Sequence, residues 1–265
     1  MLNRMEEDRW AWLTKRGALR VPQITAYFWA VKGLSTAMGE ATSDALVHSM
    51  PPVMAVLLGF TGFLVALALQ FRMARYMAWT YWFAVVMVGV FGTMAADVVH
   101  VALGVAYPVS TTFYAVVLIA VFATWRYVEG TLSIHTVDSA RREAFYWAAV
   151  VATFAMGTAL GDFTAYTLGL GYFPSAGLFA AIIVVPAIGY RWLRWNAVFC
   201  FWFAYVATRP LGASIADGLG KPKPLTGLGL GDGLVAVAFA GVIAAVVAYL
   251  AVSKADVQSG QLQSL

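Results

Sequence analysis

The chain has 265 residues, of which 62% are hydrophobic and 11% are charged, and its mean hydropathy is +0.77. A soluble domain of this size cannot bury so much apolar surface, so the composition excludes that class and indicates a polytopic membrane protein. The net charge of +4 fits loop lysines and arginines better than nucleic-acid binding, and a single cysteine, Cys200, excludes an intrachain disulfide framework.

The first 23 residues are charged, contain a few tryptophans and have no apolar core, so we expect a cytoplasmic segment and no cleavable signal. Windows of about 20 apolar residues then predict eight membrane-spanning helices with short connections. The expected bounds are 24–47, 52–71, 77–104, 111–126, 144–168, 175–190, 197–217 and 229–252. The predicted fold is an all-α integral membrane protein.

Basic residues gather in alternate connections. They are Lys15, Arg16, Arg20, Arg72, Arg75, Arg126, Arg141, Arg142, Arg191, Arg194 and Lys254. The opposite loops HSMPP, GVAYPVS and LGLGYFP carry no lysine or arginine, and only GKPKP breaks this pattern. The positive-inside rule therefore predicts that both termini of this multi-pass protein are cytoplasmic.

One sequence pattern occurs four times, and it ends at Asp44, Asp97, Asp162 and Asp217. The segments are FWAVKGLSTAMGEATSD, YWFAVVMVGVFGTMAAD, YWAAVVATFAMGTALGD and FWFAYVATRPLGASIAD. All four fit [FY]-W-x9-G-x3-[GAS]-D, and a tryptophan at one fixed offset from four aspartates favours ancestral duplication over chance.

Each copy lies on an odd-numbered predicted span and is followed by a plainer even-numbered one, so the repeating unit is a pair of helices. The single membrane domain then divides into repeats 24–75, 76–130, 143–194 and 195–253, between the N-terminal segment 1–23 and a cytoplasmic tail 254–265. Because every unit holds two spans, the four motif helices run in the same direction. The repeats are therefore parallel, and we expect a pseudo-symmetry axis along the membrane normal.

A glycine and a small residue four positions apart form a groove that admits a neighbouring helix. The motif places such a groove immediately before each aspartate, with the glycines Gly39, Gly92, Gly157 and Gly212. Close packing at these points would bring the four carboxylates together in the outer half of the bundle. Each motif tryptophan lies 15 residues earlier, about 22 Å along a helix, where an indole anchor at the cytoplasmic interface is expected.

Acids outnumber bases inside the predicted spans. The acids are Glu40, Asp44, Asp97, Asp162 and Asp217, against the candidate bases Lys32 and Arg209. An ionised carboxylate inside a bilayer costs at least a few kcal/mol, so it needs a partner or a wet cavity. Protons or a bound metal ion would best meet the deficit. The alternative is that each aspartate caps a helix or makes a structural hydrogen bond.

Two histidines accompany the acids in the first half of the chain. Glu40, Asp44 and His48 share one helix face, and His100 follows Asp97 by three residues. Carboxylates with optional imidazole suit divalent ions, with Mn²⁺ favoured and Mg²⁺, Ca²⁺ or Fe²⁺ as alternatives. The expected metal ligands are therefore Asp44, Asp97, Asp162, Asp217, Glu40, His48 and His100. Glu40 is replaced by Thr93, Thr158 and Ala213 in the other copies, so we expect an asymmetric site.

The fourth copy differs most from the others. Pro210 cannot donate to the helical ladder and is expected to break or kink the seventh span as a hinge. Arg209 beside it would pair with an aspartate when no cation is bound. In the glycine-rich GLGLGDG that follows, Asp232 is expected at the pore mouth.

The runs KxxxxxMGEATSD, YWFAVVMVGVFGTMAADVVH and TRPLGASIADGLGKP resemble a bacterial family of multi-span inner-membrane proteins usually called membrane-anchored proteins. The resemblance covers almost the whole chain and implies no particular activity. In its logic, the repeated acidic motif is also similar to that of cation/proton exchangers and manganese exporters with repeated transmembrane acids, although the E-x-G-D-K signature of one such family is absent.

We expect a divalent metal cation transporter or exporter with Mn²⁺ as the favoured substrate, exchanging protons through the same carboxylates. The alternatives are a proton or monovalent-cation channel or exchanger, and a membrane scaffold that transports nothing. No enzyme is expected, because HExxH, G-x-S-x-G and a usable Ser/His pairing are absent. The eighth span has no lysine for a retinal Schiff base. Lipid, cations and protons are the expected partners.

Overall fold

The computed structural model describes residues 17–258, apart from the side chains of residues 101 and 102. This part of the chain is all-α. Its long helices are α2 (Ala26–Ser49), α3 (Pro52–Arg72), α4 (Ala78–Asp97), α5 (Tyr107–Glu129), α6 (Ala140–Asp162), α7 (Tyr172–Trp192), α8 (Ala197–Gly220) and α9 (Asp232–Ser253). Residues 1–16 of the expected N-terminal segment and 259–265 of the expected tail lie outside the described residues.

The helix bounds follow the predicted spans closely. Two inner helices extend beyond their α-helical part, because the π-helical turns η1 (Val98–Ala102) and η3 (Phe163–Thr167) directly continue α4 and α6. Seven of the eight helices are long and apolar enough to cross a membrane, and α2 is the exception. Helix α2 carries Lys32, Glu40 and Asp44, which lower its hydropathy. The chain is thus a multi-pass membrane protein by the length and composition of its helices.

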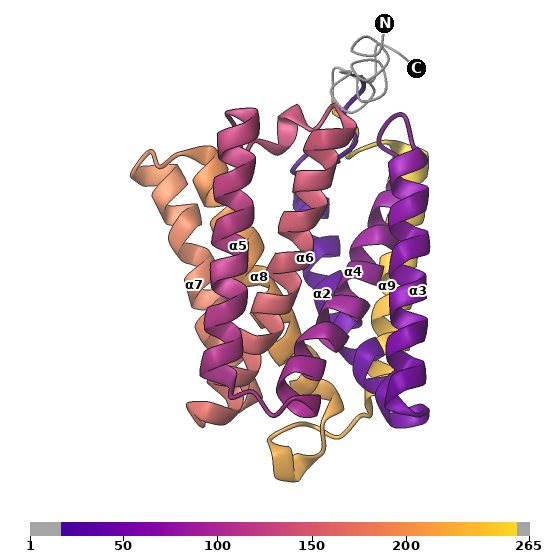
Figure 1. The fold of residues 1–265 in the computed structure, drawn as a ribbon, viewed down its shortest axis with the longest axis vertical. Coiled ribbons are helices and arrows are strands. Elements are labelled where there is room, and N and C mark those ends of the chain that lie inside the picture. Colours follow the sequence, from indigo (N-terminus) through magenta and orange to yellow (C-terminus); the bar gives the residue numbers. More distant parts are fainter. Residues whose placement is uncertain (1–16, 259–265) are drawn as a thin grey trace, which may run out of the picture.

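The four motif helices form a closed inner ring. Helix α2 packs against α4, α4 against α6, α6 against α8, and α8 returns to α2. Each outer helix packs mainly on the inner helix of the following repeat: α3 on α4, α5 on α6, α7 on α8 and α9 on α2 (Figure 1). The last repeat therefore completes the first one. These contacts agree with four parallel repeats arranged about a pseudo-symmetry axis.

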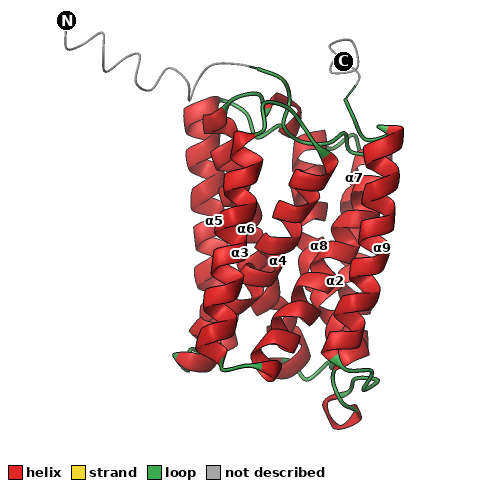
Figure 2. Cartoon of the chain, turned by 90° about the vertical axis from the view of Figure 1, so that its right-hand side faces the viewer, coloured by secondary structure: helices red, strands yellow, loops and turns green. Residues whose placement is uncertain are grey.

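Both ends of the described chain lie at the same end of the bundle (Figures 1 and 2). They are joined there, since the backbone N–H of Gln23 donates to the Asp256 carbonyl at 2.7 Å and the side chain of Gln258 donates to the Val21 carbonyl. Tyr76 binds the Asp256 carboxylate at the same end. We call this the terminal end; the connection between α8 and α9 lies at the opposite end (Figure 1).

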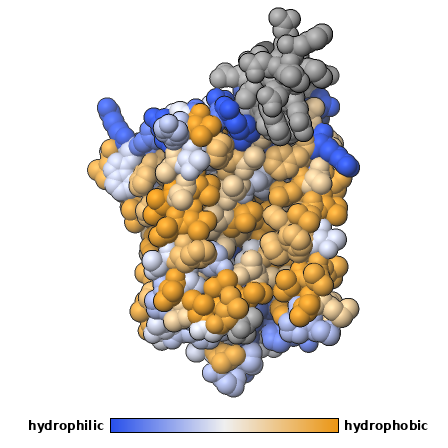
Figure 3. All heavy atoms as spheres, viewed as in Figure 1, coloured by the Kyte–Doolittle hydropathy of each residue, from blue (hydrophilic) through white to orange (hydrophobic). Residues whose placement is uncertain are grey.

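The outer helices expose apolar side chains, and the inner helices bury polar ones. Exposed examples on the outer helices are Val53, Leu57, Val116, Ile119, Val237 and Val252. Figure 3 shows apolar residues over the middle of one face and hydrophilic residues at its two ends. The inner helices bury Lys32, Thr93, Thr158 and Arg209 completely. This inside-out distribution is the one that a lipid environment favours.

The prediction that the motif tryptophans are anchors at the membrane interface is wrong for three of the four. Trp82, Trp147 and Trp202 are at most 5% exposed, and only Trp29 is half-buried. The Trp202 indole donates to the Leu132 carbonyl at 2.9 Å, and the other two rings pack in the same aromatic core. On α4, α6 and α8 the motif tryptophan therefore points into the bundle, where it packs against neighbouring helices, and not toward lipid.

The first residues of the four motifs, Phe28, Tyr81, Tyr146 and Phe201, are buried with the tryptophans. The hydroxyls of Tyr81 and Tyr146 are hydrogen-bonded to each other. This aromatic layer fills the ring at the terminal end of the inner helices.

Pro210 does not break α8, as the sequence had suggested, because the helix continues from Ala197 to Gly220. Its ring lies against Gly157 of α6, where a side chain on the glycine would meet the proline Cδ at 3.1 Å. A proline removes only one backbone N–H donor from the helix, and the surrounding packing holds the helix together where that hydrogen bond is missing.

Candidate cation site

The motif glycines are the points of closest approach between inner helices. A Cβ built on Gly39 would lie 2.8 Å from the Gly89 Cα, and one built on Gly92 would lie 2.9 Å from the Phe154 Cβ. One on Gly157 would lie 2.6 Å from the Arg209 Cβ, and one on Gly212 would lie 2.6 Å from the Thr36 Cβ. Each glycine thus meets the residue three positions before the next motif glycine, around the whole ring.

Beyond this layer, at the end of the ring opposite the terminal end, lies a cavity of about 330 Å³. All five acids singled out in the sequence line it. The lining residues that carry polar groups are Glu40, Asp44, His48, Asp97, Tyr107, Asp162, Tyr166, Asp217 and Lys221. Close packing at the glycines brings the aspartates of four repeats into one space, because each aspartate follows its glycine by five residues.

Arg209 lies behind the cavity lining, in contact with Glu40. It is fully buried, and its Nη2 donates to the Glu40 carboxylate at 2.6 Å, to the Thr158 hydroxyl at 2.6 Å and to the Thr93 hydroxyl. Glu40, Thr93 and Thr158 occupy the same motif position in repeats one, two and three. A guanidinium from the fourth repeat therefore joins all four inner helices. The sequence had suggested an aspartate partner, and the partner is Glu40.

Lys221 supplies the second cation of the cavity. Its ammonium lies 2.5 Å from Asp44 and 3.8 Å from Asp232, the first residue of α9. Burial alone would lower the pKa of Lys221, but Asp44, Asp217 and Asp232 outweigh this effect and raise it above its ordinary value. The lysine is therefore charged, and it ties the start of the α8–α9 connection to α2.

The remaining acids, Asp97, Asp162 and Asp217, are not paired with a cation by direct contact among the described residues. No hydrogen bond or ion pair joins the carboxylates of Asp97, Asp162 or Asp217 to another side chain in residues 17–258. Asp217 is nonetheless only 5% exposed. Oxygen atoms of Glu40, Asp44 and Asp217 lie within 4.8 Å of one another. Three carboxylates at this separation fit a divalent cation that prefers oxygen ligands.

Asp97 and Asp162 lie outside this group of three, although they line the same cavity. The expected convergence of four aspartates thus has two parts. Asp44 and Asp217 join Glu40 on the α2–α8 side, and Asp97 and Asp162 face them from α4 and α6. The asymmetry expected from Glu40 is present, and Arg209 and Lys221 add to it.

The two histidines lie in different surroundings. His48 lines the cavity, but its side chain is 70% exposed, and its Nδ1 lies 2.8 Å from the Asp44 carbonyl and 3.6 Å from Asp232. His100 lies on the π-helical turn after Asp97, where its ring stacks on Tyr107 and its Nδ1 lies 2.5 Å from the Val105 carbonyl. It is not among the lining residues. The π-turn changes the helical register, so the i, i+3 relation to Asp97 does not place His100 in the cavity.

Sequence reasoning missed Lys221, Thr93 and Thr158 as members of the site. GKPKP, the one basic loop on the wrong side, was the available signal for Lys221. Lys221, the first lysine of this loop, lies at the cavity because α8 ends at Gly220, one residue earlier. For Thr93 and Thr158, the available signal was their alignment with Glu40. The alignment shows that the three residues occupy equivalent positions, but it does not show that all three contact Arg209.

Fold and site together define a class: a helical membrane protein in which four repeats enclose one acidic cavity. Within this class, the chain belongs to the family described as Repeat of Unknown Function (DUF347), which matches residues 27–76, 80–131, 145–194 and 200–256. These segments correspond to the four repeats found in the sequence, so the internal duplication is confirmed. Comparison with curated proteins and with solved structures gives no match.

Proposed function

We propose that this chain is a secondary transporter of divalent metal cations in a bacterial inner membrane, with Mn²⁺ as the favoured substrate. The observation that carries the proposal is the charge balance of the cavity. Five acids line the cavity, and two cations contact them, Arg209 at Glu40 and Lys221 at Asp44, so Asp97, Asp162 and Asp217 have no direct ion pair among the described residues. Three carboxylates cannot remain ionised and unpaired at membrane depth without a large cost. A divalent cation, with protons replacing it when it leaves, removes this cost.

The packing between the cavity and the terminal end favours a carrier over a permanently open channel. Arg209 fills the axis first, and Lys32 follows, with its Nζ 4.3 Å from the Phe154 ring and 4.4 Å from the Tyr205 ring. The paired hydroxyls of Tyr81 and Tyr146 come next. A cation would meet the buried Arg209 guanidinium and then a tightly packed aromatic layer around Lys32 on this route, so passage requires a rearrangement of the ring, as in alternating access.

Flux measurements in proteoliposomes test the proposal. Mn²⁺ entry, followed with an encapsulated metal-quenched dye, is expected for the wild type and should fall by about tenfold or more in Asp97→Asn and Asp217→Asn. Asp217 belongs to the group of three carboxylates and Asp97 is an unpaired acid of the same cavity, and loss of either charge should cost at least as much as the 10–100-fold typical of second-shell changes. Asp138→Asn is the matched control, because this acid lies at the terminal end beside Arg142 and should leave the flux unchanged.

Unchanged Mn²⁺ flux in both cavity variants would contradict the proposal. Proton or monovalent-cation flux without any divalent flux would support a proton or monovalent-cation channel or exchanger instead. In that case protons alone would neutralise Asp97, Asp162 and Asp217. A wild type that moves no cation would favour the scaffold interpretation.

A further inference from the structure

A second and larger cavity opens on the side of the bundle. It has a volume of about 690 Å³ and lies between α5 and α7, with α6 and α8 behind it. Helix α5 packs on α6 and α7 on α8, and these two outer helices have no more than marginal contact with each other. The space between them is therefore open toward the surroundings of the bundle. We call it the lateral groove, and its lining shares no residue with the acidic cavity.

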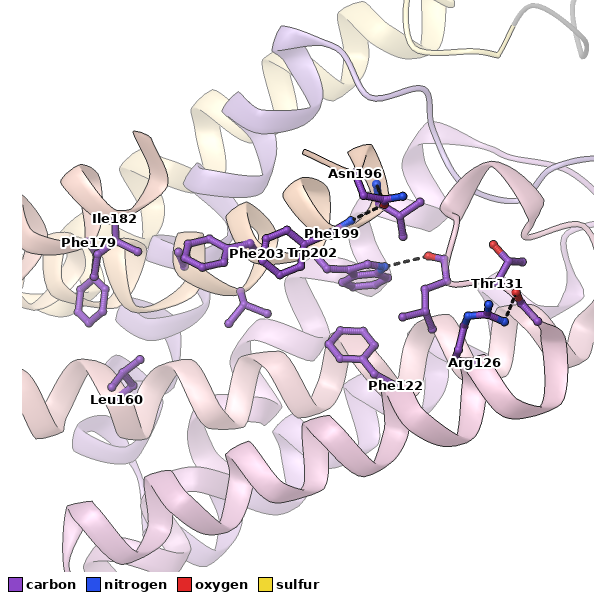
Figure 4. Close-up of a pocket in the computed structure, with 15 residues that line it drawn as sticks. Phe122, Arg126, Thr131, Leu160, Phe179, Ile182, Asn196, Phe199, Trp202 and Phe203 are labelled. Atoms are coloured by element: carbon purple, nitrogen blue, oxygen red, sulfur yellow. Dashed lines mark hydrogen bonds between the residues drawn. The ribbon is translucent and has the colours of Figure 1, made fainter. Parts of the chain in front are cut away.

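The lateral groove is divided into an apolar part and a polar end. Figure 4 shows Leu160, Phe179 and Ile182 at one end and Arg126, Thr131 and Asn196 at the other. Aromatic side chains of α8 and Phe122 of α5 lie between them (Figure 4). The polar end is at the terminal end of the bundle, where α5 finishes and α8 begins.

The polar end carries donors and a positive charge but no acid. Arg126 uses its Nη1 to bind the Gly130 carbonyl, and its other guanidinium nitrogens have no partner among the described residues. The Asn196 Oδ1 accepts the backbone N–H groups of Val198 and Phe199, so only its amide N–H groups remain to face outward. None of the described lining residues is Asp or Glu. The end therefore suits an anion that accepts several hydrogen bonds, and a guanidinium favours phosphate geometry.

The length of the apolar part matches one leaflet of a bilayer. The lining residues of α8 run from Val198 to Ala207, which at 1.5 Å per residue is about 14 Å along the helix. Half of the roughly 30 Å hydrocarbon core is close to this value. A charged phosphate at the membrane surface and an acyl chain reaching the middle would thus fill the polar and apolar parts together.

We infer that the lateral groove is a binding site for an anionic phospholipid, with the headgroup phosphate held by Arg126, Thr131 and Asn196 and one acyl chain lying along α8. Basic pockets between transmembrane helices are a recurring type of anionic-lipid site. A second copy packed here about a two-fold axis is a poorer occupant, because it would bring two Arg126 guanidinium groups into one interface without an acid in the lining to balance them.

Lipid retention by the purified full-length protein tests this inference. Native mass spectrometry in detergent would compare phosphatidylglycerol with phosphatidylcholine of the same acyl chains. The wild type should retain phosphatidylglycerol more tightly, and Arg126→Gln should remove about tenfold or more of that preference, the size expected for hydrogen bonds to a charged group. Arg72→Gln, at the end of α3 and outside the groove, is the matched control.

A groove-filling variant, Val206→Trp, should reduce retention of both lipids. Equal retention of the two lipids by the wild type would overturn the inference, and so would Arg126→Gln behaving like Arg72→Gln. A dimer that Val206→Trp disrupts would assign the groove to a second copy and would also overturn it. Because Arg126 is exposed, its variant should fold even if Val206→Trp does not. None of these readings depends on cation transport.

Discussion

At the scale of single residues, the feature that distinguishes this protein is a pair of basic side chains, Arg209 and Lys221, that contact a cluster of five acids. Lys221 and Arg209 differ in what they do. Arg209 is fully buried and connects four helices, whereas Lys221 is partly accessible at the end of α8 and contacts only the acids at the mouth of the cavity. One is part of the architecture, and the other occupies space that a substrate cation would need.

Lys221→Gln should therefore increase Mn²⁺ affinity. The ammonium lies 2.5 Å from Asp44, so a metal ion bound by Asp44, Glu40 and Asp217 must compete with it. Removal of this charge is expected to tighten binding by on the order of tenfold, a size typical of one close charge acting on another. Equilibrium dialysis with Mn²⁺ measures the change. Lys223→Gln, two residues further along the same connection and exposed, is the control; weaker binding by Lys221→Gln would contradict the competition.

Arg209 and Glu40 should depend on each other for stability. Arg209→Met leaves the Glu40 carboxylate buried without its countercharge, and Glu40→Gln does the reverse. Each single change is expected to cost about 3–5 kcal/mol, while the double variant should cost clearly less than the sum. Thermal unfolding in detergent gives the three values. Additive losses would show that the 2.6 Å contact is not an energetic pair.

At the scale of helices, close approach at the motif glycines decides where the carboxylates lie. The small residue is needed on one side only, because the partner at the next helix ranges from Gly89 to the much larger Phe154 and Arg209. This variation explains why the repeats keep the glycine but not the residue three positions before it. The outer helices supply the apolar surface of the bundle.

Gly39→Ala should loosen the contact between α2 and α4. The added Cβ would lie 2.8 Å from the Gly89 backbone, which cannot move aside as a flexible side chain can. We expect a loss of about 1–3 kcal/mol in unfolding free energy, the usual cost of overpacking. Gly33→Ala on the same helix is the matched control, because nothing lies within 4 Å of its added Cβ. The control should be neutral or slightly stabilising, and equal losses in both variants would refute the contact.

At the scale of the whole molecule, the ring closes only when the last outer helix reaches the first inner one. Helix α9 packs on α2, and the segments near residues 23 and 256 are hydrogen-bonded to each other. Each outer helix has its main packing partner in another repeat. The protein therefore behaves as one unit although it is built from four copies, and its stability depends on contacts between distant parts of the sequence.

Division of the chain in the connection between α5 and α6 tests this closure. Residues 1–133 and 134–265, produced separately, should each be degraded or aggregate, since the first half lacks the partner of α2 and the second lacks the partner of α9. Expressed together, the two halves should co-purify through a tag on one of them. A first half that is stable and monomeric alone would contradict the interlocked arrangement.

Much could be determined from the sequence alone. Composition identified the membrane class, hydropathy placed the helices to within a few residues, and the fourfold pattern revealed the duplication and four of the five acids. These features depend on local residue type and on repetition along the chain. The parallel direction of the repeats also follows from counting two spans in each unit.

Only the tertiary structure decided the partners. Sequence spacing could not show that Arg209 would reach Glu40, Thr93 and Thr158, that Lys221 would enter the cavity, or that His100 would turn away from it on a π-helical turn. It also assigned the tryptophans to the interface, because hydropathy does not distinguish an inner helix from an outer one. Such contacts depend on which helices become neighbours when the ring closes, and that is a property of the packed bundle and not of any segment of it.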